Sequence, residues 1–230
     1  MQMGKEKKEL WEILGMLFRA HPWHGVSLGD EQPQVVTAYI ELVPSDTVKY
    51  EIDKYSGHLK VDRPQTYSNI CPTLYGMLPQ TYSGERVAGI CNKKTGRTDI
   101  VGDRDPLDIC VLTEKLVPHG DILLKARPIG GFRMLDGGEA DDKIIAVMKN
   151  DALYENWSDI QSCPSAVIER LEHYFLTYKQ APGSKKTQSE ILGIYGRDEA
   201  YEIIEAAHAD YADKYGDVKQ ALSSVLKFKP

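Results

Sequence analysis

The sequence predicts an α+β protein in which a closed barrel of short strands precedes a pair of helices. Segments rich in β-branched and aromatic residues follow one another between residues 34 and 148, with no helical apolar period between them. That order favours a barrel over a parallel sheet with crossover helices. The last third instead carries apolar residues at helical spacing. No internal repeat or linker divides the chain, so we expect a single barrel domain.

The first predicted strands form an antiparallel meander. Turn residues at Pro44–Asp46 and Ser56–Gly57 separate its three segments. Lys49 and Glu51 are two apart in the second segment, so their side chains lie on one face of that strand. The chain from Ile70 to Val101 is predicted to be a loop because of its Pro and Gly content. The predicted strands cover residues 35–42, 48–52, 59–62, 109–113, 122–129 and 143–148.

Helical patterns occur at both ends of the chain. Apolar residues at helical spacing predict a helix over residues 5–19, so residues 1–24 are expected to be an N-terminal helical extension of a barrel domain spanning 25–230. A second helix is predicted to begin after Ser162, which is a candidate N-cap, and Pro164 suits the first turn of that helix. A final helix is predicted from about Asp198 to Tyr215. The buried stripe of the helix after Ser162 is predicted to be Val167, Ile168, Leu171, Tyr174, Phe175 and Tyr178.

Composition narrows the classes of function. Lys plus Arg number 28 against 34 Asp plus Glu, a formal net charge of −6, and no basic cluster dominates a segment, so a nucleic-acid partner is not expected. No apolar stretch reaches the ~18 residues of a membrane span. The first twenty residues lack the basic-then-apolar order and the small-residue cleavage site of a secretory signal. The four cysteines form no Cys-x-x-Cys pair. We expect a cytoplasmic protein with reduced thiols and no membrane partner.

Two acidic clusters carry the chemical signal. The first is Asp103-Arg104-Asp105-Pro106-Leu107-Asp108 and the second runs from Asp136 to Lys143. Two carboxylates ~5 Å apart at an effective dielectric of ~20 repel by roughly 3 kcal/mol. If the clusters converge, five uncompensated anions require protonation, water or hard cations. Oxygen-only ligands favour Mg²⁺ or Mn²⁺ over zinc. His21 and His24 form a weaker candidate metal pair, with no further ligand at a suitable spacing.

Five ordered blocks resemble the family I soluble inorganic pyrophosphatases. They are Lys49–Lys54, Val61–Arg63, Asp103–Asp108, Asp136–Lys143 and the pair Tyr178-Lys179, within a match from about Val35 to Tyr211. The resemblance implies a five-stranded, OB-like antiparallel barrel flanked by two main helices. It also implies that several Mg²⁺ ions are bound, with Mn²⁺ or Zn²⁺ as substitutes, and that pyrophosphate is hydrolysed to two phosphates without a covalent intermediate. A homo-oligomer is expected.

The resemblance also implies a role for thirteen residues. Asp105 falls on the carboxylate that orients or deprotonates the attacking water. Metal ligands are implied at Glu41, Glu51, Asp103, Asp108, Asp136 and Asp141, with Glu41 in an outer-sphere position. Substrate-binding groups are implied at Lys49, Arg63, Tyr75, Lys143, Tyr178 and Lys179.

The chain departs from the family pattern at two positions. Arg104 stands between two aspartates where the family has a small or neutral residue, so its side chain either pairs with a ligand carboxylate or points to solvent. Cys71 precedes Pro72 where many bacterial members carry an active-site tyrosine, and Tyr67 or Tyr82 is a candidate replacement.

Two non-catalytic alternatives stay open from sequence. A barrel that binds single-stranded nucleic acid needs a basic groove with exposed aromatic side chains, which the acidic composition disfavours. A divalent-cation-binding protein without turnover would use the same aspartates. Release of phosphate from pyrophosphate distinguishes the enzyme from both.

Overall fold

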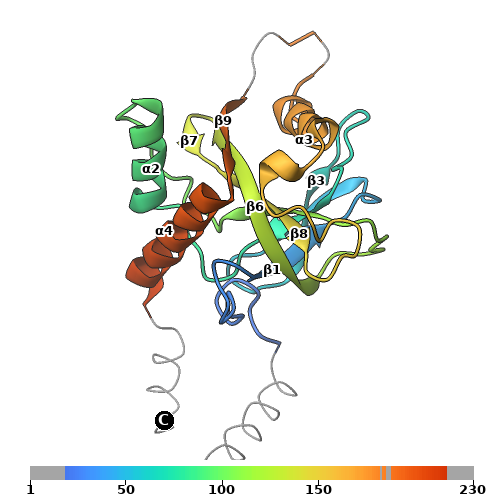
Figure 1. Cartoon of the computed structure of the whole chain (residues 1–230), viewed down its shortest axis with the longest axis horizontal. Coiled ribbons are helices and arrows are strands. Elements are labelled where there is room, and N and C mark those ends of the chain that lie inside the picture. Colours follow the sequence, from blue (N-terminus) through green and yellow to red (C-terminus); the bar gives the residue numbers. More distant parts are fainter. Residues whose placement is uncertain (1–18, 182, 185–187, 217–230) are drawn as a thin grey trace, which may run out of the picture.

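The computed structural model describes residues 19–181, 183–184 and 188–216 (Figure 1). The helix predicted for residues 5–19 lies outside these ranges apart from Arg19. That helix and the domain boundary at residue 24 therefore remain predictions.

Five strands close into a ring. In spatial order they are β1 (Val36–Leu42), β4 (Leu74–Met77), β5 (Asp108–Leu112), β8 (Lys143–Met148) and β6 (Ile122–Asp136), and β6 pairs back to β1. The predicted five-stranded, OB-like barrel is confirmed. Its antiparallel description needs one correction, because β5 and β8 run parallel. Parallel neighbours need a long connection between them, and the whole of β6 lies within that connection.

Strand β6 is the longest element of the sheet. It runs for 15 residues, well beyond the predicted end at residue 129, and its far half pairs with β7 (Glu139–Ala140) and β9 (Ser189–Gly196). The predicted strand ended just before the Gly130-Gly131 pair. In the structure, Gly131 leaves space for the Tyr195 side chain of β9, since a Cβ on Gly131 would lie 2.4 Å from the Tyr195 hydroxyl oxygen. Strand β9 was not predicted.

Strands β2 (Val48–Ile52) and β3 (Leu59–Pro64) form a separate two-stranded sheet. The predicted hairpin between them is confirmed, but the meander that was to include β1 is wrong. Strand β1 already has both of its edges occupied, by β4 and β6. The hairpin is joined to β1 by a side chain instead, because the Ile52 amide donates to Glu41 Oε1 over 2.7 Å.

Three α-helices cover the barrel within the described residues. Helices α2 (Glu85–Thr95) and α4 (Arg197–Tyr215) lie on one side and α3 (Ser165–Thr177) on another (Figure 1). Helix α3 begins after Pro164, so Ser162 is not its N-cap. Ser162 belongs to a short 3₁₀ helix, η1 (Ile160–Ser162), which Asp159 caps.

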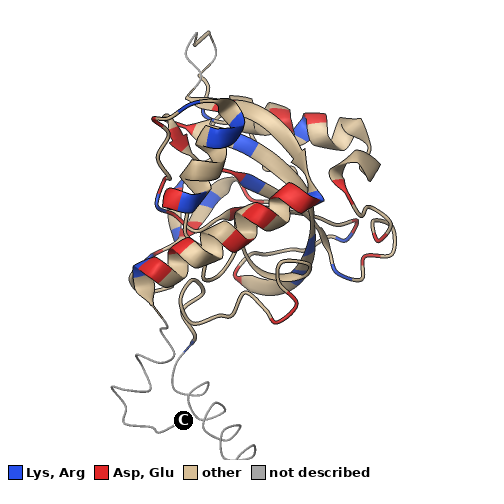
Figure 2. Cartoon of the chain, turned by 60° about the vertical axis from the view of Figure 1, so that its left-hand side comes forward, with Lys and Arg blue, Asp and Glu red and all other residues tan. Residues whose placement is uncertain are grey.

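Helix α4 is amphipathic. Its predicted inner residues Ile203, Ile204, Ala207 and Tyr211 are all buried, and acidic residues recur along the helix (Figure 2). In α3, Ile168, Leu171, Tyr174 and Phe175 are buried as predicted. No helix in the described part of the chain combines the length and the apolar character that a membrane span needs.

Helix α2 lies where the sequence predicted a loop. Its first turn has no side-chain cap of its own. Asp210 of α4 takes that place: its buried carboxylate accepts from the backbone amides of Gly84, Arg86 and Val87 at 3.0–3.3 Å. A cap supplied by a residue 124 positions away leaves no local sequence signal.

Replacing Asp210 by Ala is expected to destabilise the protein by about 2 kcal/mol, because one buried and two partly buried backbone amides lose their acceptor. Thermal unfolding should shift by about 4–8 °C for a chain of this size. Asp213→Ala is the matched control, since Asp213 is one turn further along α4, contacts the same Arg86 and is exposed. Equal shifts for the two variants would contradict the capping role.

Candidate active site

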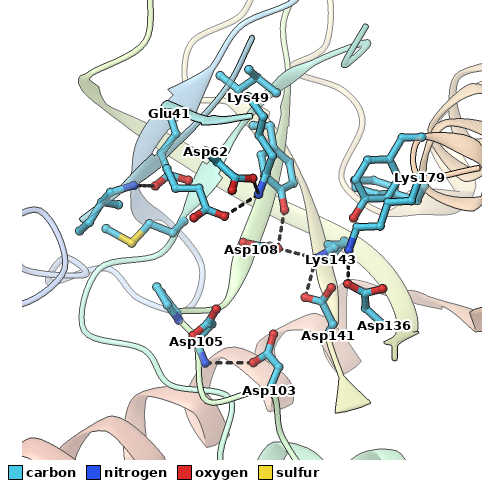
Figure 3. Close-up of a pocket in the computed structure, with 18 of the residues that line it drawn as sticks. Glu41, Lys49, Asp62, Asp103, Asp105, Asp108, Asp136, Asp141, Lys143 and Lys179 are labelled. Atoms are coloured by element: carbon cyan, nitrogen blue, oxygen red, sulfur yellow. Dashed lines mark hydrogen bonds and ion pairs between the residues drawn. The ribbon is translucent and has the colours of Figure 1, made fainter. Parts of the chain in front are cut away.

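All thirteen predicted site residues line one cavity of about 340 Å³ at the mouth of the barrel. Eleven of them lie in the five sequence blocks, Glu41 and Tyr75 lie outside those blocks, and the fold brings all of them together. Figure 3 shows carboxylates and ammonium groups from these blocks pointing toward one another. Convergence of the two acidic clusters, on which the prediction depended, is therefore observed.

Strand register explains the convergence. Asp108 is the first residue of β5 and Lys143 the first residue of β8, and the parallel pairing sets them directly side by side. Asp136 ends β6, and Asp141 lies in the short connection from β7 to β8. Because these strand ends meet at one rim of the barrel, their side chains share one space.

The segment that carries Asp103 and Asp105 is held by close backbone packing. A Cβ on Gly102 would lie 2.1 Å from the Ser83 carbonyl oxygen, so no side chain fits there. The Arg104 amide donates to that carbonyl over 3.0 Å, and the Ser83 amide donates to the Asp105 carbonyl over 2.8 Å. The Asp105 amide donates to Asp103 Oδ1 over 3.0 Å. These bonds fix the backbone that presents both carboxylates.

The β2–β3 hairpin forms the opposite wall. Lys49 and Arg63 are paired across the two strands, and Lys49 Nζ lies 2.7 Å from Glu51 Oε1 and 3.2 Å from Asp62 Oδ2. Arg63 contacts Asp62 as well, and its guanidinium carbon lies 5.9 Å from the ring centre of Tyr178. The Lys49–Glu51 face predicted from the alternation is thus part of the cavity.

Lys143 is the most deeply buried charge in the cavity. Its side chain is 2% exposed, and its ammonium group contacts both Asp108 and Asp141. Burial opposes this charge, but the two carboxylates outweigh burial and hold the pKa of Lys143 well above its usual value. The Tyr75 hydroxyl donates to Asp108. Burial, and to a smaller extent the Asp108 charge, raises the pKa of Tyr75.

The expectation of five uncompensated anions is wrong for four of the five aspartates. Lys143 contacts Asp108 and Asp141, Lys179 contacts Asp136 and Lys54 contacts Asp105. Asp103 forms no ion pair with a basic side chain among the described residues. Burial and the nearby Asp141 raise the pKa of Asp103 to about 8. Burial also raises the pKa of Glu41 to about 8.

The donor set of the cavity fits a hard divalent cation. Nine carboxyl side chains and five basic side chains line it, which is an excess of four acidic groups, and no histidine or cysteine is among the lining residues. Oxygen donors of this kind suit Mg²⁺ or Mn²⁺ better than zinc. Within the described residues no three acidic, histidine or cysteine side chains already converge on one point, and ammonium groups lie between the carboxylates. An ion held there would share Asp108, Asp136 and Asp141 with the lysine ammonium groups that contact them.

Arg104 and Cys71, the two residues that depart from the family pattern, do not line the cavity. Arg104 forms no ion pair within the described chain and lines a second cavity between α2 and α4 with Arg86 and Lys214. Cys71 is fully buried in the core under α3. Neither candidate replacement fills its place: Tyr67 is 64% exposed, and Tyr82 lines the second cavity. Tyr174 of α3 lines the active-site cavity instead.

Sequence reasoning also missed residues. Lys54, Asp62 and Trp23 line the cavity without having been assigned a role. Lys54 and Asp62 lie inside blocks that carried the resemblance, so their position in those blocks was an available signal. Asp142 belongs to the second acidic cluster but faces the core, where Tyr195 donates to it over 3.2 Å. Burial raises the pKa of Asp142 to about 7.

His21 and His24 are engaged with other groups. His24 Nδ1 lies 2.7 Å from the Tyr211 hydroxyl, and the His24 ring stacks on Trp23. This arrangement is that of an aromatic cluster between the N-terminal segment and α4.

Comparison with known proteins gives one consistent result. Residues 38–212 match the profile of the inorganic pyrophosphatase family. The inorganic pyrophosphatase of Chlamydia caviae is 52% identical over 199 residues, which cover 85% of this chain and 92% of that protein. Soluble inorganic pyrophosphatase 3 of Arabidopsis thaliana is 34% identical, with 84% of this chain and 80% of the relative covered. The crystal structure of the Thermus thermophilus inorganic pyrophosphatase superposes with a TM-score of 0.69 at 28% identity and covers 84% of this chain and 99% of that one.

Proposed function

Because the chain belongs to the inorganic pyrophosphatase family and is an inorganic diphosphatase, we propose that it hydrolyses pyrophosphate with Mg²⁺ through the cavity described above. The observation that carries the proposal is the convergence of nine carboxyl and five basic side chains in one 340 Å³ space. Such a space suits a substrate that is itself an anion and enters with cations.

The metal role is proposed for the residues whose carboxyl groups the fold gathers at the barrel rim. When bound there, Mg²⁺ would offset the charge of the substrate and lower the pKa of a water molecule. Several ions are expected, and Mn²⁺ or Zn²⁺ are candidate substitutes. The proposed holders of these ions are Asp103, Asp108, Asp136, Asp141, Glu51 and, in an outer position, Glu41.

The other side chains have proposed roles toward the reacting groups. Asp105 would accept the proton of the attacking water, since its side chain is half-exposed in the cavity and can reach solvent. Basic and phenolic groups would hold the two phosphates and stabilise charge on the departing one without covalent catalysis. Those groups are Lys49, Arg63, Tyr75, Lys143, Tyr178 and Lys179.

Colorimetric phosphate release tests the proposal directly. Purified protein should release two phosphates per pyrophosphate at neutral pH with Mg²⁺, and the rate should vanish with excess chelator and return when Mg²⁺ is restored. A rate that persists in chelator would contradict metal dependence. No release at any Mg²⁺ concentration would contradict the hydrolase itself.

Replacing Asp105 by Asn should lower kcat by ~10²–10⁴-fold, the usual contribution of a positioned acid or base. Mg²⁺ affinity should change much less, because Asp105 is not among the proposed ligands. The measurement is a kcat series together with a Mg²⁺ titration of each variant. A parallel loss of metal binding and rate would show that Asp105 is a ligand instead.

We also propose a cytoplasmic homo-oligomer, which the resemblance to the family supports. Sedimentation velocity on the purified chain would measure its assembly, and a single species of monomer mass would contradict the proposal.

A further inference from the structure

Lys54 is a basic residue of the cavity with no assigned task. Its ammonium group contacts Asp105 Oδ1, and no other basic side chain within the described residues forms an ion pair with Asp105. Lys54 comes from the turn between β2 and β3, whereas Asp105 comes from the segment before β5. The contact therefore joins the hairpin wall of the cavity to its acidic wall.

The turn that carries Lys54 is firmly structured. The Asp53 carboxylate accepts from the Ser56 amide and hydroxyl, both at 2.9 Å, and from the Tyr55 amide at 3.3 Å. The Asp53 amide donates to the His58 carbonyl over 2.8 Å and closes the turn. At its tip, a Cβ on Gly57 would lie 2.9 Å from both His21 and Pro22. Lys54 therefore projects from a fixed point.

The Asp105 carboxylate has one charged partner. Its backbone is fixed through Ser83 and Asp103, and within the described residues Lys54 is the one side chain that forms a hydrogen bond or ion pair with its carboxylate. That contact occupies Oδ1. Oδ2 has no hydrogen-bond partner within the described chain, so it stays available to accept a proton.

We propose that Lys54 is a positioning residue that orients the Asp105 carboxylate, so that Oδ2 receives the proton of the water that attacks phosphorus. The inference rests on the proposed role of Asp105. The water oxygen forms the new bond to phosphorus, and one proton of the water goes to Oδ2. The bridging P–O bond breaks, and the second orthophosphate departs with the bridging oxygen and its electron pair. A carboxylate that is held in a productive orientation accepts a proton faster than one that rotates freely. Supporting residues that fix the orientation of a reactive group therefore raise the rate.

Because the Lys54–Asp105 ion pair is exposed, an effect of Lys54 on the rate can be distinguished from an effect on stability. The Lys54 and Asp105 side chains are 49% and 45% exposed. Solvent-exposed ion pairs contribute little to stability, so loss of Lys54 should leave the thermal midpoint nearly unchanged while the rate falls.

The test compares Lys54→Met with Lys60→Met. Lys60 lies on the same hairpin and its side chain is 52% exposed, and within the described residues its ammonium group forms one ion pair, with the turn residue Asp53 at 3.7 Å. Lys54→Met should lower kcat by ~10–100-fold, the range expected for a misplaced reactive group. Its KM for pyrophosphate and its Mg²⁺ dependence should stay within about twofold of the Lys60→Met values, and Lys54→Arg should recover most of the rate.

A double-mutant cycle with Asp105→Asn decides how Lys54 acts. If Lys54 works through Asp105, adding Lys54→Met to Asp105→Asn should cause no further loss of kcat. A full loss in that background, or a rise in KM with kcat unchanged, would overturn the inference and make Lys54 a direct substrate contact. Equal rates for Lys54→Met, Lys60→Met and wild type would also overturn it, with the proposed function intact. An inactive wild-type protein would instead refute the proposed function.

Discussion

Replacing Asp108 by Asn should lower kcat/KM at least ~10³-fold while the far-UV circular dichroism spectrum stays that of the folded protein. Asp108 stands at the start of β5, where it meets both Lys143 and the Tyr75 hydroxyl. An uncharged amide of the same shape keeps the packing but removes the negative charge that the proposed metal ion would require. Loss of several kcal/mol of metal stabilisation corresponds to at least three factors of ten at about 1.36 kcal/mol each.

The matched control is Asp99→Asn. Asp99 is exposed and lies four positions before Asp103 in the same connection, but it does not line the cavity. Its variant should keep the wild-type rate. Turnover within tenfold of wild type for Asp108→Asn would mean that the metal-binding loop is wrongly assigned.

Replacing Lys143 by Met should destabilise the metal-free protein by about 3 kcal/mol, because it leaves Asp108 and Asp141 in a largely buried site without their cation. For a chain of this size the thermal midpoint in chelator should fall by about 6–12 °C. Mg²⁺ should raise the midpoint of the variant more than that of wild type, since a divalent ion supplies the missing positive charge. The rate should fall by ~10²–10³-fold, the usual loss when one group that stabilises developing charge is removed.

Lys149→Met provides the comparison. Lys149 follows the same strand, β8, but its ammonium group contacts Glu31 at 2.9 Å on the surface. That variant should have the wild-type midpoint with or without Mg²⁺. If Lys143→Met loses the same stability in Mg²⁺ as in chelator, Lys143 contributes only packing and not charge balance.

Predictions from local sequence patterns were accurate for the elements whose structure does not depend on partners that are distant in the sequence. Strands β1, β2, β5 and β8 and helix α4 begin and end within one residue of their predicted bounds, and β3 ends two residues beyond its predicted end, since each has a clear pattern of its own. The carboxylates of the Asp103–Asp108 segment also share the cavity as predicted.

Other elements depend on partners that are distant in sequence. Helix α2 is capped by Asp210, and β4 is four residues long between β1 and β5. Strand β9 continues only because β6 extends past Gly131 to receive it. None of these partners can be identified from the segment itself, so a Pro- and Gly-rich stretch was predicted to be a loop.

The sequence by itself indicated, through its resemblance to a known family, thirteen of the side chains that meet in the cavity, and its residue types indicated the chemistry that they suit, because residue type is a local property. Only the tertiary structure decided how those charges are compensated: Lys143 lies between two aspartates, Lys54 reaches Asp105 from another sheet, and Arg104 turns away. The reason is physical. Charge compensation depends on distances between segments that are far apart in the chain, and those distances are set by how the barrel closes.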